Sequence, residues 1–361
     1  MSKIIFCSDL HLGLETNGYI LENGWNNRAL ESFACFEEVC TYIKNCNFSQ
    51  DNKIDYLIIC GDIFDVKMPS LKYQNKFKEL IFDLSKHCKI VILLGNHDII
   101  STKNNISVLD DIEIFNLKNI YLFKNNTIKE LELSNGEKIK AASLTWDLKL
   151  DELDSFLNSA KEQNVNIVFG HLTVIGAKNS NFIFKEGVPL ELLKKYNFRC
   201  MALGDIHKTQ ILSENPFIFY TGSLIPTDFG EENDIKGFYV YDTVVNEYSF
   251  HETNYTKLKT IRGDIEYILE NINNNDYTNH YLKLVLNIYN KNAKTPNFHE
   301  ILNGKCKQFI VEYNNIEEKV KKFNISSSFT FEEVADLCLK DNKEVLDLCK
   351  KIKNEYLETR A

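Results

Sequence analysis

The amino-acid sequence predicts an α/β fold, and three features of the first two thirds of the chain support this prediction. Short apolar runs recur along the chain, amphipathic helical patterns lie between them, and polar residues follow where the runs end. Apolar runs of about four to eight residues with turn residues on either side are typical of buried strands. Strands that alternate with helices are typical of a layered α/β domain.

Seven runs have the length and the β-branched or aromatic content of buried strands. They are 3–7, 56–60, 90–94, 166–169, 200–203, 217–220 and 237–241. Two stretches between them show apolar residues three and four positions apart, which is typical of amphipathic helices. The first stretch is Ala29, Phe33, Phe36, Cys40 and Ile43, and the second is Phe77, Leu80, Ile81 and Leu84.

Length and composition indicate a globular protein with two or three domains. The chain has 361 residues, of which 44% are hydrophobic and 26% charged. The longest uncharged apolar runs, 56–61 and 90–95, are far shorter than the roughly 20 residues that span a bilayer. The N-terminus lacks the apolar segment of a signal peptide, so we expect a cytoplasmic protein that is not bound to a membrane.

Charge and cysteine content restrict the possible functions further. The net charge of −9 argues against a protein that coats nucleic acid through a basic surface, but it is compatible with a DNA enzyme that makes local contacts. Ten cysteines are present without a C-x-x-C pair, and Cys7 and Cys60 lie within apolar runs. We therefore expect free, buried thiols.

Polar residues that can bind metal ions gather where the predicted strands end. The five segments are Ser8-Asp9-Leu10-His11, Gly61-Asp62, Gly95-Asn96-His97-Asp98, Gly170-His171 and Gly204-Asp205-Ile206-His207. The carboxyl ends of strands in an open α/β sheet form the edge at which ligands bind, because the loops there can converge on one crevice. The sequence therefore predicts one site built from all five segments.

Oxygen and imidazole donors without thiolates suit Mn²⁺, Fe²⁺ or Zn²⁺. The predicted ligands are Asp9, His11, Asp62, Asn96, His171, Asp205 and His207. Seven ligands are too many for one ion, whereas two ions roughly 3.5–4 Å apart that share a carboxylate, with Asp62 as the natural bridge, would use them all. Such a pair lowers the pKa of a bound water towards neutrality, so a protein base is not needed.

An acid for the leaving group is then the remaining requirement of a phosphate-ester hydrolase. His97 follows the predicted ligand Asn96 and should point into the same crevice without binding metal. We predict that His97 is this acid or a phosphate-stabilising group, with Asp98 or Asp65 holding its ring and tautomer.

The ordered motifs resemble those of the calcineurin-like metallophosphoesterases. The matching elements are Asp9-x-His11-Leu-Gly13, Gly61-Asp62-x-Phe-Asp65, Gly95-Asn96-His97-Asp98, Gly170-His171 and Gly204-x-x-His207. The later segments Tyr220-Thr-Gly-Ser223 and Asp228-Phe-Gly-Glu231 are similar to those of the SbcD-type nuclease subunits of double-strand-break repair. The resemblance covers residues 1–242 well.

This resemblance implies a β-sandwich flanked by helices and a Mn²⁺-dependent DNA exonuclease and endonuclease that acts as a homodimer. It also implies a partner ATPase of the SMC-like SbcC type, whose coiled coil docks on the C-terminal helices of the nuclease. The family pattern assigns Asp9, His11, Asp62 and His207 to one ion and Asp62, Asn96 and His171 to the other. Position 205 departs from the pattern, since most members have His there, and we expect its carboxylate to favour a harder ion.

The domain organisation that we expect is a metallophosphoesterase domain at 1–249, a small α+β capping domain at 250–325 and a helical pair at 326–361. Strand-like runs in the capping domain are 281–288 and 308–313. Thr330 and Glu333 form a capping-box pattern that predicts a helix start. A second helix carries an apolar stripe predicted to bind the ATPase, made of Val345, Leu348, Cys349, Ile352 and Tyr356.

Several alternatives remain open from the sequence. The protein is either this nuclease, another metallophosphoesterase such as a protein phosphatase or a cyclic-nucleotide phosphodiesterase, or a silent scaffold for the ATPase. Asp205 is either a ligand or a turn residue, and the C-terminal stripe docks either on the ATPase or on the chain's own capping domain. The 77–84 stripe is either core or dimer interface. Lys67, Lys72, Lys76 and Lys78 either contact DNA or form a solvated face.

Overall fold

The computed structural model describes residues 2–49, 53–101, 103–180, 182–288, 296–315, 345–348 and 350–351. The chain separates into two units. One comprises Met1–Asn287 with Lys294–Asn314, and the other comprises Ile288–Ala293 with Asn315–Ala361. The larger unit contains every sheet described below, except that Ile288 and Asn315, each the last residue of a strand, belong to the smaller unit. The three-domain division expected from the sequence stays a prediction.

Two six-stranded sheets form the centre of the larger unit. The first has the order β16-β15-β1-β2-β3-β6, with bounds Glu247–Glu252, Gly237–Asp242, Ser2–Cys7, Lys53–Cys60, Lys89–Leu93 and Ile120–Phe123. Strands β1, β2, β3 and β6 are parallel, whereas β15 and β16 complete the sheet in antiparallel pairing. Four parallel strands therefore end at one edge of this sheet.

The second sheet has the order β13-β14-β12-β9-β8-β7. Its strands are Gln210–Glu214, Phe217–Tyr220, Cys200–Gly204, Ile167–His171, Lys138–Leu144 and Ile128–Glu132. Strands β14, β12, β9 and β8 are parallel, and the outer strands β13 and β7 pair antiparallel. All seven predicted strand runs occur as strands of these two sheets, which confirms the α/β fold.

Alternating residues along the strands face opposite layers, as the pleat requires. Ile4 and Phe6 of β1 pack into an apolar core that also contains Ile167 and Phe169 of β9, so this core lies between the two sheets. Ile5 of β1 instead packs against the helices on the outer face of the first sheet. The two sheets therefore stack face to face as a sandwich.

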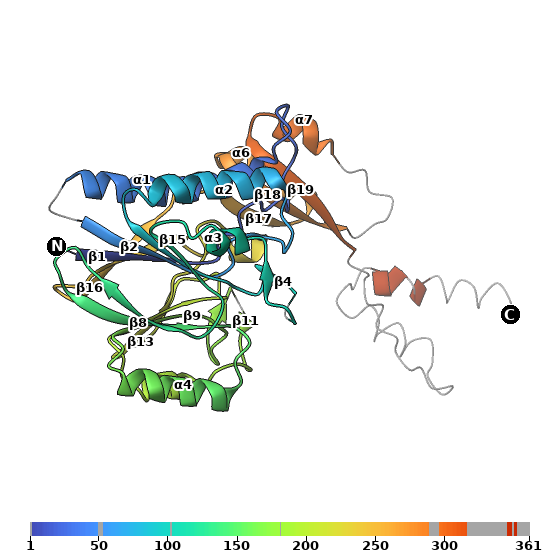
Figure 1. The fold of residues 1–361 in the computed structure, drawn as a ribbon. Coiled ribbons are helices and arrows are strands. Elements are labelled where there is room, and N and C mark those ends of the chain that lie inside the picture. Colours follow the sequence, from blue (N-terminus) through green and yellow to red (C-terminus); the bar gives the residue numbers. More distant parts are fainter. Residues whose placement is uncertain are drawn as a thin grey trace. The chain divides into compact units, whose positions relative to one another are not determined.

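Helices cover both outer faces of the sandwich (Figure 1). Helices α1 (Asn27–Phe48) and α2 (Leu71–Leu84) pack on the first sheet, and α4 (Leu150–Glu162) and α5 (Leu190–Lys194) pack on the second. Helix α3 (Asp110–Ile114) contacts β6. The α/β/β/α layering places the carboxyl ends of the central strands of both sheets close together.

The apolar stripe of α2 belongs to the core. Phe77, Ile81 and Leu84 are fully buried beneath the helix, and Leu80 packs at the margin of the same core. Burial of a side chain such as Phe77 contributes about 1.5–3 kcal/mol. The alternative that this stripe forms a dimer interface is therefore wrong.

Three of the four lysines considered for DNA contact have partners in the protein. Lys76 pairs with Glu37 at 2.6 Å and Lys78 with Asp111 at 2.6 Å. Lys72 donates to the backbone oxygen of Gly24 at 2.7 Å. These contacts favour the solvated-face interpretation for these three residues.

A three-stranded sheet of order β17-β18-β19 lies in the region expected to be a capping domain, and it is called the cap below. Its elements are β17 (Lys257–Gly263), α6 (Ile265–Asn274), β18 (Tyr277–Ile288), α7 (Phe298–Leu302) and β19 (Cys306–Asn315). Strands β17 and β18 are parallel and joined by α6, whose first turn is capped by the Asp264 side chain. The two strands expected here from the sequence are present, and β17 is an additional strand with only Leu258 and Ile261 buried.

The remaining elements are short and lie in loops. They are β4 (Ile99–Ser101), β5 (Ile106–Ser107), β10 (Lys178–Asn179), β11 (Phe182–Ile183) and the 3-10 helix η2 (Phe229–Glu231). Every cysteine within the described residues is a free thiol, as expected. None of the helices described combines the length and the apolar character needed to cross a membrane.

Candidate metal centre

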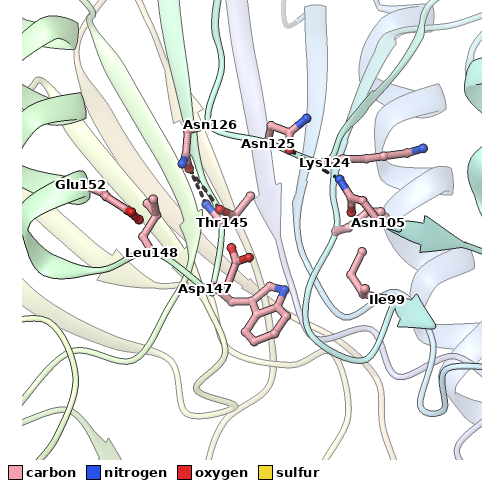
Figure 2. Close-up of a pocket in the computed structure, with 11 residues that line it drawn as sticks. Ile99, Asn105, Lys124, Asn125, Asn126, Thr145, Asp147, Leu148 and Glu152 are labelled. Atoms are coloured by element: carbon pink, nitrogen blue, oxygen red, sulfur yellow. Dashed lines mark hydrogen bonds between the residues drawn. The ribbon is translucent and has the colours of Figure 1, made fainter. Parts of the chain in front are cut away.

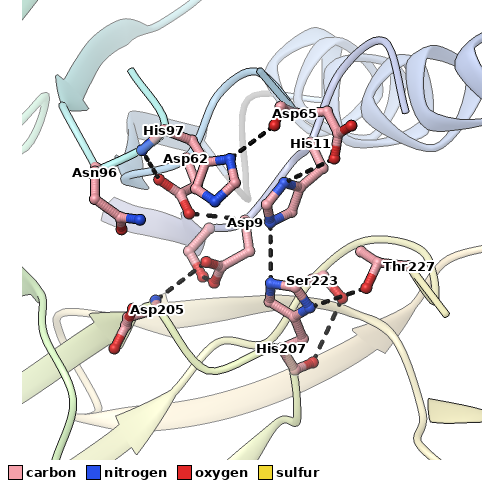
Figure 3. A network of polar contacts seen from close by, with 12 residues as sticks. Asp9, His11, Asp62, Asp65, Asn96, His97, Asp205, His207, Ser223 and Thr227 are labelled. Atoms are coloured by element: carbon pink, nitrogen blue, oxygen red, sulfur yellow. Dashed lines mark hydrogen bonds and ion pairs between the residues drawn. The ribbon is translucent and has the colours of Figure 1, made fainter. Parts of the chain in front are cut away.

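All five predicted segments meet at one rim of the sandwich. Figure 3 labels residues of every segment except Gly170-His171. Each segment lies at the carboxyl end of a central strand. Asp9 and His11 follow β1, Asp62 follows β2, Asn96 and His97 follow β3, His171 ends β9, and Asp205 and His207 follow β12. The two sheets therefore contribute opposite sides of a single cluster.

The backbone at this rim adopts conformations that are rare for residues other than glycine. Asp9, His11, Asp62 and Asp205 have φ values of 49°, 41°, 51° and 92°. Positive φ at residues with a Cβ costs free energy, and such strain gathers at functional sites. Gly95 allows close approach here, because a Cβ at this position would overlap the Oδ1 of Asp62.

One end of the cluster is formed by Asp9, His11 and His207. Their potential ligand atoms all lie within 4.8 Å of one another. The Nε2 atoms of His11 and His207 face each other at 2.9 Å. Asp9 is held by the Ser8 hydroxyl, which donates to its Oδ2, and by the backbone N–H of Asp205, which donates to Oδ1 at 3.1 Å.

The other end of the cluster is formed by Asp62, Asn96 and His171. The Nε2 of His171 lies 3.0 Å from the Oδ1 of Asn96 and 3.4 Å from the Oδ1 of Asp62. Asp62 also approaches the first end, since its Oδ2 lies 4.0 Å from the Nε2 of His11. Asp62 thus lies between the two ends, in the position expected of a shared ligand, and Asp9 also lies within 4.8 Å of Asp62 and His171.

The hydrogen bonds of the imidazoles indicate that the cluster fits cations. The Nδ1 of His171 donates to the backbone oxygen of Cys60 at 2.9 Å, and the Nδ1 of His207 donates to Glu231 at 2.7 Å. In the neutral rings, the Nε2 atoms are therefore lone-pair acceptors. These acceptors converge with carboxylate and amide oxygens, which is an arrangement that divalent cations satisfy.

The electrostatics of the buried groups reflect the same crowding of acceptors. Burial alone would lower the pKa of His171, but Asp62, followed by Asp9 and Asp205, raises that pKa well above its usual value. Burial conversely works to raise the pKa of Asp62, yet His171, followed by His11 and His97, holds it below its usual range. The cluster therefore attracts positive charge strongly, and protons supply that charge where no cation is bound.

His97 lies at the same cluster, where its ring forms a third group of potential ligand atoms with His11 and Asp62, so its expected role without a bound metal stays a prediction. Its Nδ1 donates to the backbone oxygen of Asp65 at 2.7 Å, and its backbone N–H donates to the Oδ1 of Asp62 at 3.0 Å. The ring is therefore oriented by the backbone of Asp65. The carboxylate of Asp65 instead lies 3.4 Å from the Nδ1 of His11.

Asp98 has a different role from the one expected. Its carboxyl group is 1% exposed and accepts hydrogen bonds from the backbone N–H groups of Ile63, Phe64 and Gly95 at 2.9–3.2 Å. The interpretation that Asp98 holds the His97 ring is wrong, because this side chain ties together the loops after β2 and β3. Burial, followed by the charge of Asp62, raises the pKa of Asp98 to about 7.

Asp205 lies at the edge of the cluster. Its Oδ1 is 3.9 Å from the Nε2 of His171, while its Oδ2 accepts a hydrogen bond from Thr173. Burial raises the pKa of this carboxyl group. The residue therefore faces the His171 end of the cluster but belongs to none of the compact ligand groups within the described residues.

Several residues that support the cluster are not among those predicted. Glu231 and Lys236 form a buried ion pair next to His207, and Thr221 contacts Ser8 beneath Asp9. Glu231 belongs to a segment that already stands out in the sequence, Asp228-Phe-Gly-Glu231. Its spacing from His207 carries no periodic signal, so its role is visible only in the structure.

The predicted partner-binding stripe lies mostly outside the described residues. Cys349, Ile352 and Tyr356 belong to that part of the chain. Val345 and Leu348 lie in a helical segment at 345–348 and are 40% and 55% exposed. The helix start predicted from Thr330 and Glu333 also lies outside the described residues.

A polar cavity of about 360 Å³ lies farther along the same rim (Figure 2). It is formed by the segments that follow β3, β6 and β8, including Leu94, Lys124 and Thr145. Asn126 is fixed there, because its Oδ1 accepts from the backbone N–H of Thr145 at 2.9 Å. None of the predicted metal ligands lines this cavity.

Comparison with known proteins agrees with this geometry. The family described as calcineurin-like phosphoesterase matches residues 2–209. The D subunit of the nuclease SbcCD from Staphylococcus epidermidis is 28% identical over 74% of this chain and 74% of its own length. The protein of the same name from Escherichia coli K12 is 24% identical over 51% of this chain and 54% of its own length.

Among solved structures, the protein TT1561 of Thermus thermophilus is similar with a TM-score of 0.42 and 10% identity. This match covers 69% of the chain and 98% of that structure.

Proposed function

Because this chain belongs to the calcineurin-like phosphoesterase family, we propose that it is a Mn²⁺-dependent DNA nuclease of the SbcD type. The substrates would be double-strand ends, single strands or hairpins, cut at their phosphodiester bonds by exonuclease and endonuclease action in DNA repair, recombination or replication. The names of the staphylococcal and Escherichia coli relatives support this choice within the family.

The convergence of Nε2 lone pairs and carboxylate oxygens at the rim is the observation that carries the proposal. His171 and His207 direct these atoms into one cluster with Asp9 and Asp62, and the Nε2 of His11 faces that of His207. Acceptors this close together repel one another unless positive charge lies among them. A cluster of this kind supports metal-dependent chemistry better than a purely structural role.

Two divalent cations would be held in the way that the family pattern implies. Asp9, His11, Asp62 and His207 would bind one cation, and Asp62, Asn96 and His171 would bind the other. Asp205 would join the second set through its Oδ1, which faces His171. When bound, the cations would neutralise charge on the phosphate and activate the attacking water.

The protein side chains would orient the substrate and supply a proton. The Nδ1 of His97 donates to the backbone of Asp65, which leaves its Nε2 as the ring atom available to the substrate. A protonated His97 would donate from Nε2 to the leaving oxygen. The backbone N–H of His97 also donates to Asp62, so the proposed acid is held next to the shared ligand.

The partners proposed for this protein follow from the same family. An SbcC-like SMC-type ATPase would bind the C-terminal stripe, of which Val345 and Leu348 are described and exposed. A homodimer is also proposed.

Deletion of residues 329–361 should leave metal-dependent nuclease activity intact but abolish binding to the ATPase in a pull-down assay. Binding by the truncated protein would refute the docking role.

A nuclease assay tests the proposed function directly. The purified protein is incubated with end-labelled duplex, single-stranded and hairpin DNA in the presence of Mn²⁺. Control reactions contain EDTA or the His97→Gln variant. We expect release of nucleotides that stops in both controls.

The contrary outcome is equally clear. Failure on every DNA, together with hydrolysis of a phosphoprotein or a cyclic nucleotide, would identify another phosphoesterase built on the same cluster. Failure on every substrate with intact binding to the ATPase would identify a scaffold.

A further inference from the structure

An ion pair outside the predicted ligand set lies directly against His207. Glu231 and Lys236 are 2% and 0% exposed, and the Nζ of Lys236 donates to the Oε2 of Glu231 at 2.7 Å. Two charges are rarely removed from water in this way without compensating contacts, because their desolvation is costly. The contacts around this pair indicate what it does.

Every acceptor position of the Glu231 carboxylate is used. Oε1 accepts from the Nδ1 of His207 at 2.7 Å and from the hydroxyl of Thr227 at 2.8 Å. Oε2 accepts from the backbone N–H of Thr227 at 3.0 Å and from Lys236. A carboxylate offers about four lone-pair sites, so Glu231 is fully satisfied and fixed in one orientation.

Lys236 closes this network back onto the same histidine. Its Nζ donates to the backbone oxygen of His207 at 2.9 Å in addition to Glu231. The side chain and the backbone of His207 are therefore both tied to one buried ion pair. A rotation of the imidazole would break its hydrogen bond to Glu231.

We infer that Glu231, supported by Lys236, is the positioning residue that fixes the tautomer and orientation of His207 for cation binding. A carboxylate only accepts hydrogen bonds, so the proton of the neutral His207 ring must reside on Nδ1. The lone pair is then on Nε2, which faces His11 across the cluster. A carboxylate partner also makes an imidazole a stronger ligand. This inference rests on the proposed function, since it requires that His207 binds a cation.

The loop that carries Glu231 is anchored independently of His207. The guanidinium of Arg28 on α1 donates to the backbone oxygen of Pro226, and the ring of Tyr281 on β18 lies 5.1 Å from that guanidinium. Glu232 accepts from the backbone N–H of Thr260 on β17. The loop is thus held by α1 and by the cap, which allows a substitution at Glu231 without loss of the loop.

The test compares Glu231→Gln with Asp228→Asn. Both substitutions remove one acidic charge from the same loop, but Asp228 is exposed and binds only the backbone of Gly230 within the described contacts. Glutamine can either accept or donate a hydrogen bond, so it no longer dictates which nitrogen of His207 is protonated. Binding of Mn²⁺ is followed by electron paramagnetic resonance, and the tautomer of His207 by ¹⁵N NMR with Mg²⁺ as the diamagnetic ion.

We expect wild-type protein and Asp228→Asn to bind two Mn²⁺ ions and to show a single Nδ1–H tautomer for His207. In Glu231→Gln, affinity at one position should fall about 10- to 100-fold while the other position keeps its affinity, and His207 should show mixed tautomers. A purely structural role of Glu231 would instead weaken both positions together and leave the tautomer unchanged.

Two further outcomes would overturn the inference. If Glu231→Gln binds both ions as the wild type does, Glu231 does not position His207, and the proposed function is unaffected. If the wild type binds no Mn²⁺, the proposed function fails and this inference fails with it. If Glu231→Gln does not fold, the double variant Glu231→Gln with Lys236→Met removes both buried charges. It is then compared with the wild type and Asp228→Asn in the same measurements.

Discussion

The two ends of the candidate metal centre are held in different ways. At one end, the carboxylate of Asp65 lies against the Nδ1 of His11, and the carboxylate of Glu231 lies against the Nδ1 of His207. At the other end, the Nδ1 of His171 is held by the backbone oxygen of Cys60, within a strand of the first sheet. One end therefore depends on side chains in loops, and the other depends on the sheet itself.

This difference indicates which substitutions can separate the two ends. Replacing a loop carboxylate should affect the His11–His207 end alone, because the backbone carbonyl at the His171 end is retained. Asp62 and Asp9 are the exceptions. Asp62 approaches both ends, and Asp9, which lies at the His11–His207 end, is also within 4.8 Å of Asp62 and His171.

Replacement of the shared carboxylate Asp62 should affect both ends of the metal centre at once. In Asp62→Ala both ends lose a ligand, so we expect hydrolysis of DNA to fall by about four orders of magnitude or more. The measurement is kcat/KM with Mn²⁺, accompanied by the stoichiometry of Mn²⁺ binding. Asp83→Asn, which changes a half-buried carboxylate on α2 that pairs with Lys44 and Lys86 on the molecule's surface, serves as the control. Activity close to that of the wild type would show that Asp62 is not shared.

Replacement of the proposed acid should leave both ends occupied. In His97→Gln we expect two bound Mn²⁺ ions but hydrolysis slowed by about 10²- to 10³-fold, because only the proton donor is lost. Binding and turnover are measured on the same preparation. Loss of a Mn²⁺ ion in this variant would reclassify His97 as a ligand.

Asp98 tests how far the backbone-held loops depend on a buried carboxyl group. Its pKa of about 7 lies above the ordinary value of about 3.9, so the folded state binds a proton that the unfolded state releases between these values. The stability of the wild type should therefore fall as pH rises from about 4 to about 7. Asp98→Asn removes this titration and should lack that part of the decline.

Urea denaturation of both proteins at pH 5 and pH 8, in the presence of EDTA, measures this effect. The expected change in the difference between their free energies of unfolding is about 1–3 kcal/mol, with the wild type relatively less stable at pH 8. A difference that does not vary with pH would show that Asp98 is ionised throughout this range.

Asp205→His should have the smallest effect and addresses the His171 end alone. The substitution introduces the imidazole that the family resemblance implies at this position. We expect activity to be kept while the preference for Mn²⁺ over Mg²⁺ rises several-fold, since a nitrogen ligand suits the softer ion. Activity is compared in titrations with each metal. An unchanged preference would indicate that Asp205 is not a ligand.

The sequence predicts the central strands well because their apolar content is unambiguous. The strands at 3–7 and 56–60 are buried on both faces, so they appear as continuous apolar runs. The outer strands β7 and β13 and the cap strand β17 are partly exposed and mix polar with apolar residues. Helix α4 has no counterpart among the predicted helices, although Leu153, Leu157 and Ala160 form a buried stripe.

The candidate site shows a similar division. Residues directly after the strands were predictable, since the parallel arrangement brings strand ends together. The partners of these residues were not, because contacts such as Glu231 with His207 depend on how loops fold in three dimensions. Asp98 illustrates the limit, since its place next to His97 in sequence suggests a contact with that ring. The positive φ of Asp62 turns the loop so that the carboxyl group of Asp98 meets backbone N–H groups instead.

The inward-facing ring nitrogens also couple the binding of a metal ion to the release of protons. A proton on His171 and a divalent ion at the same atoms exclude each other, so uptake of the ion must release acid into the solution. Acidification and chelation then act on the same equilibrium. A fall in pH would therefore weaken binding of the ion, as a competitor for the metal would.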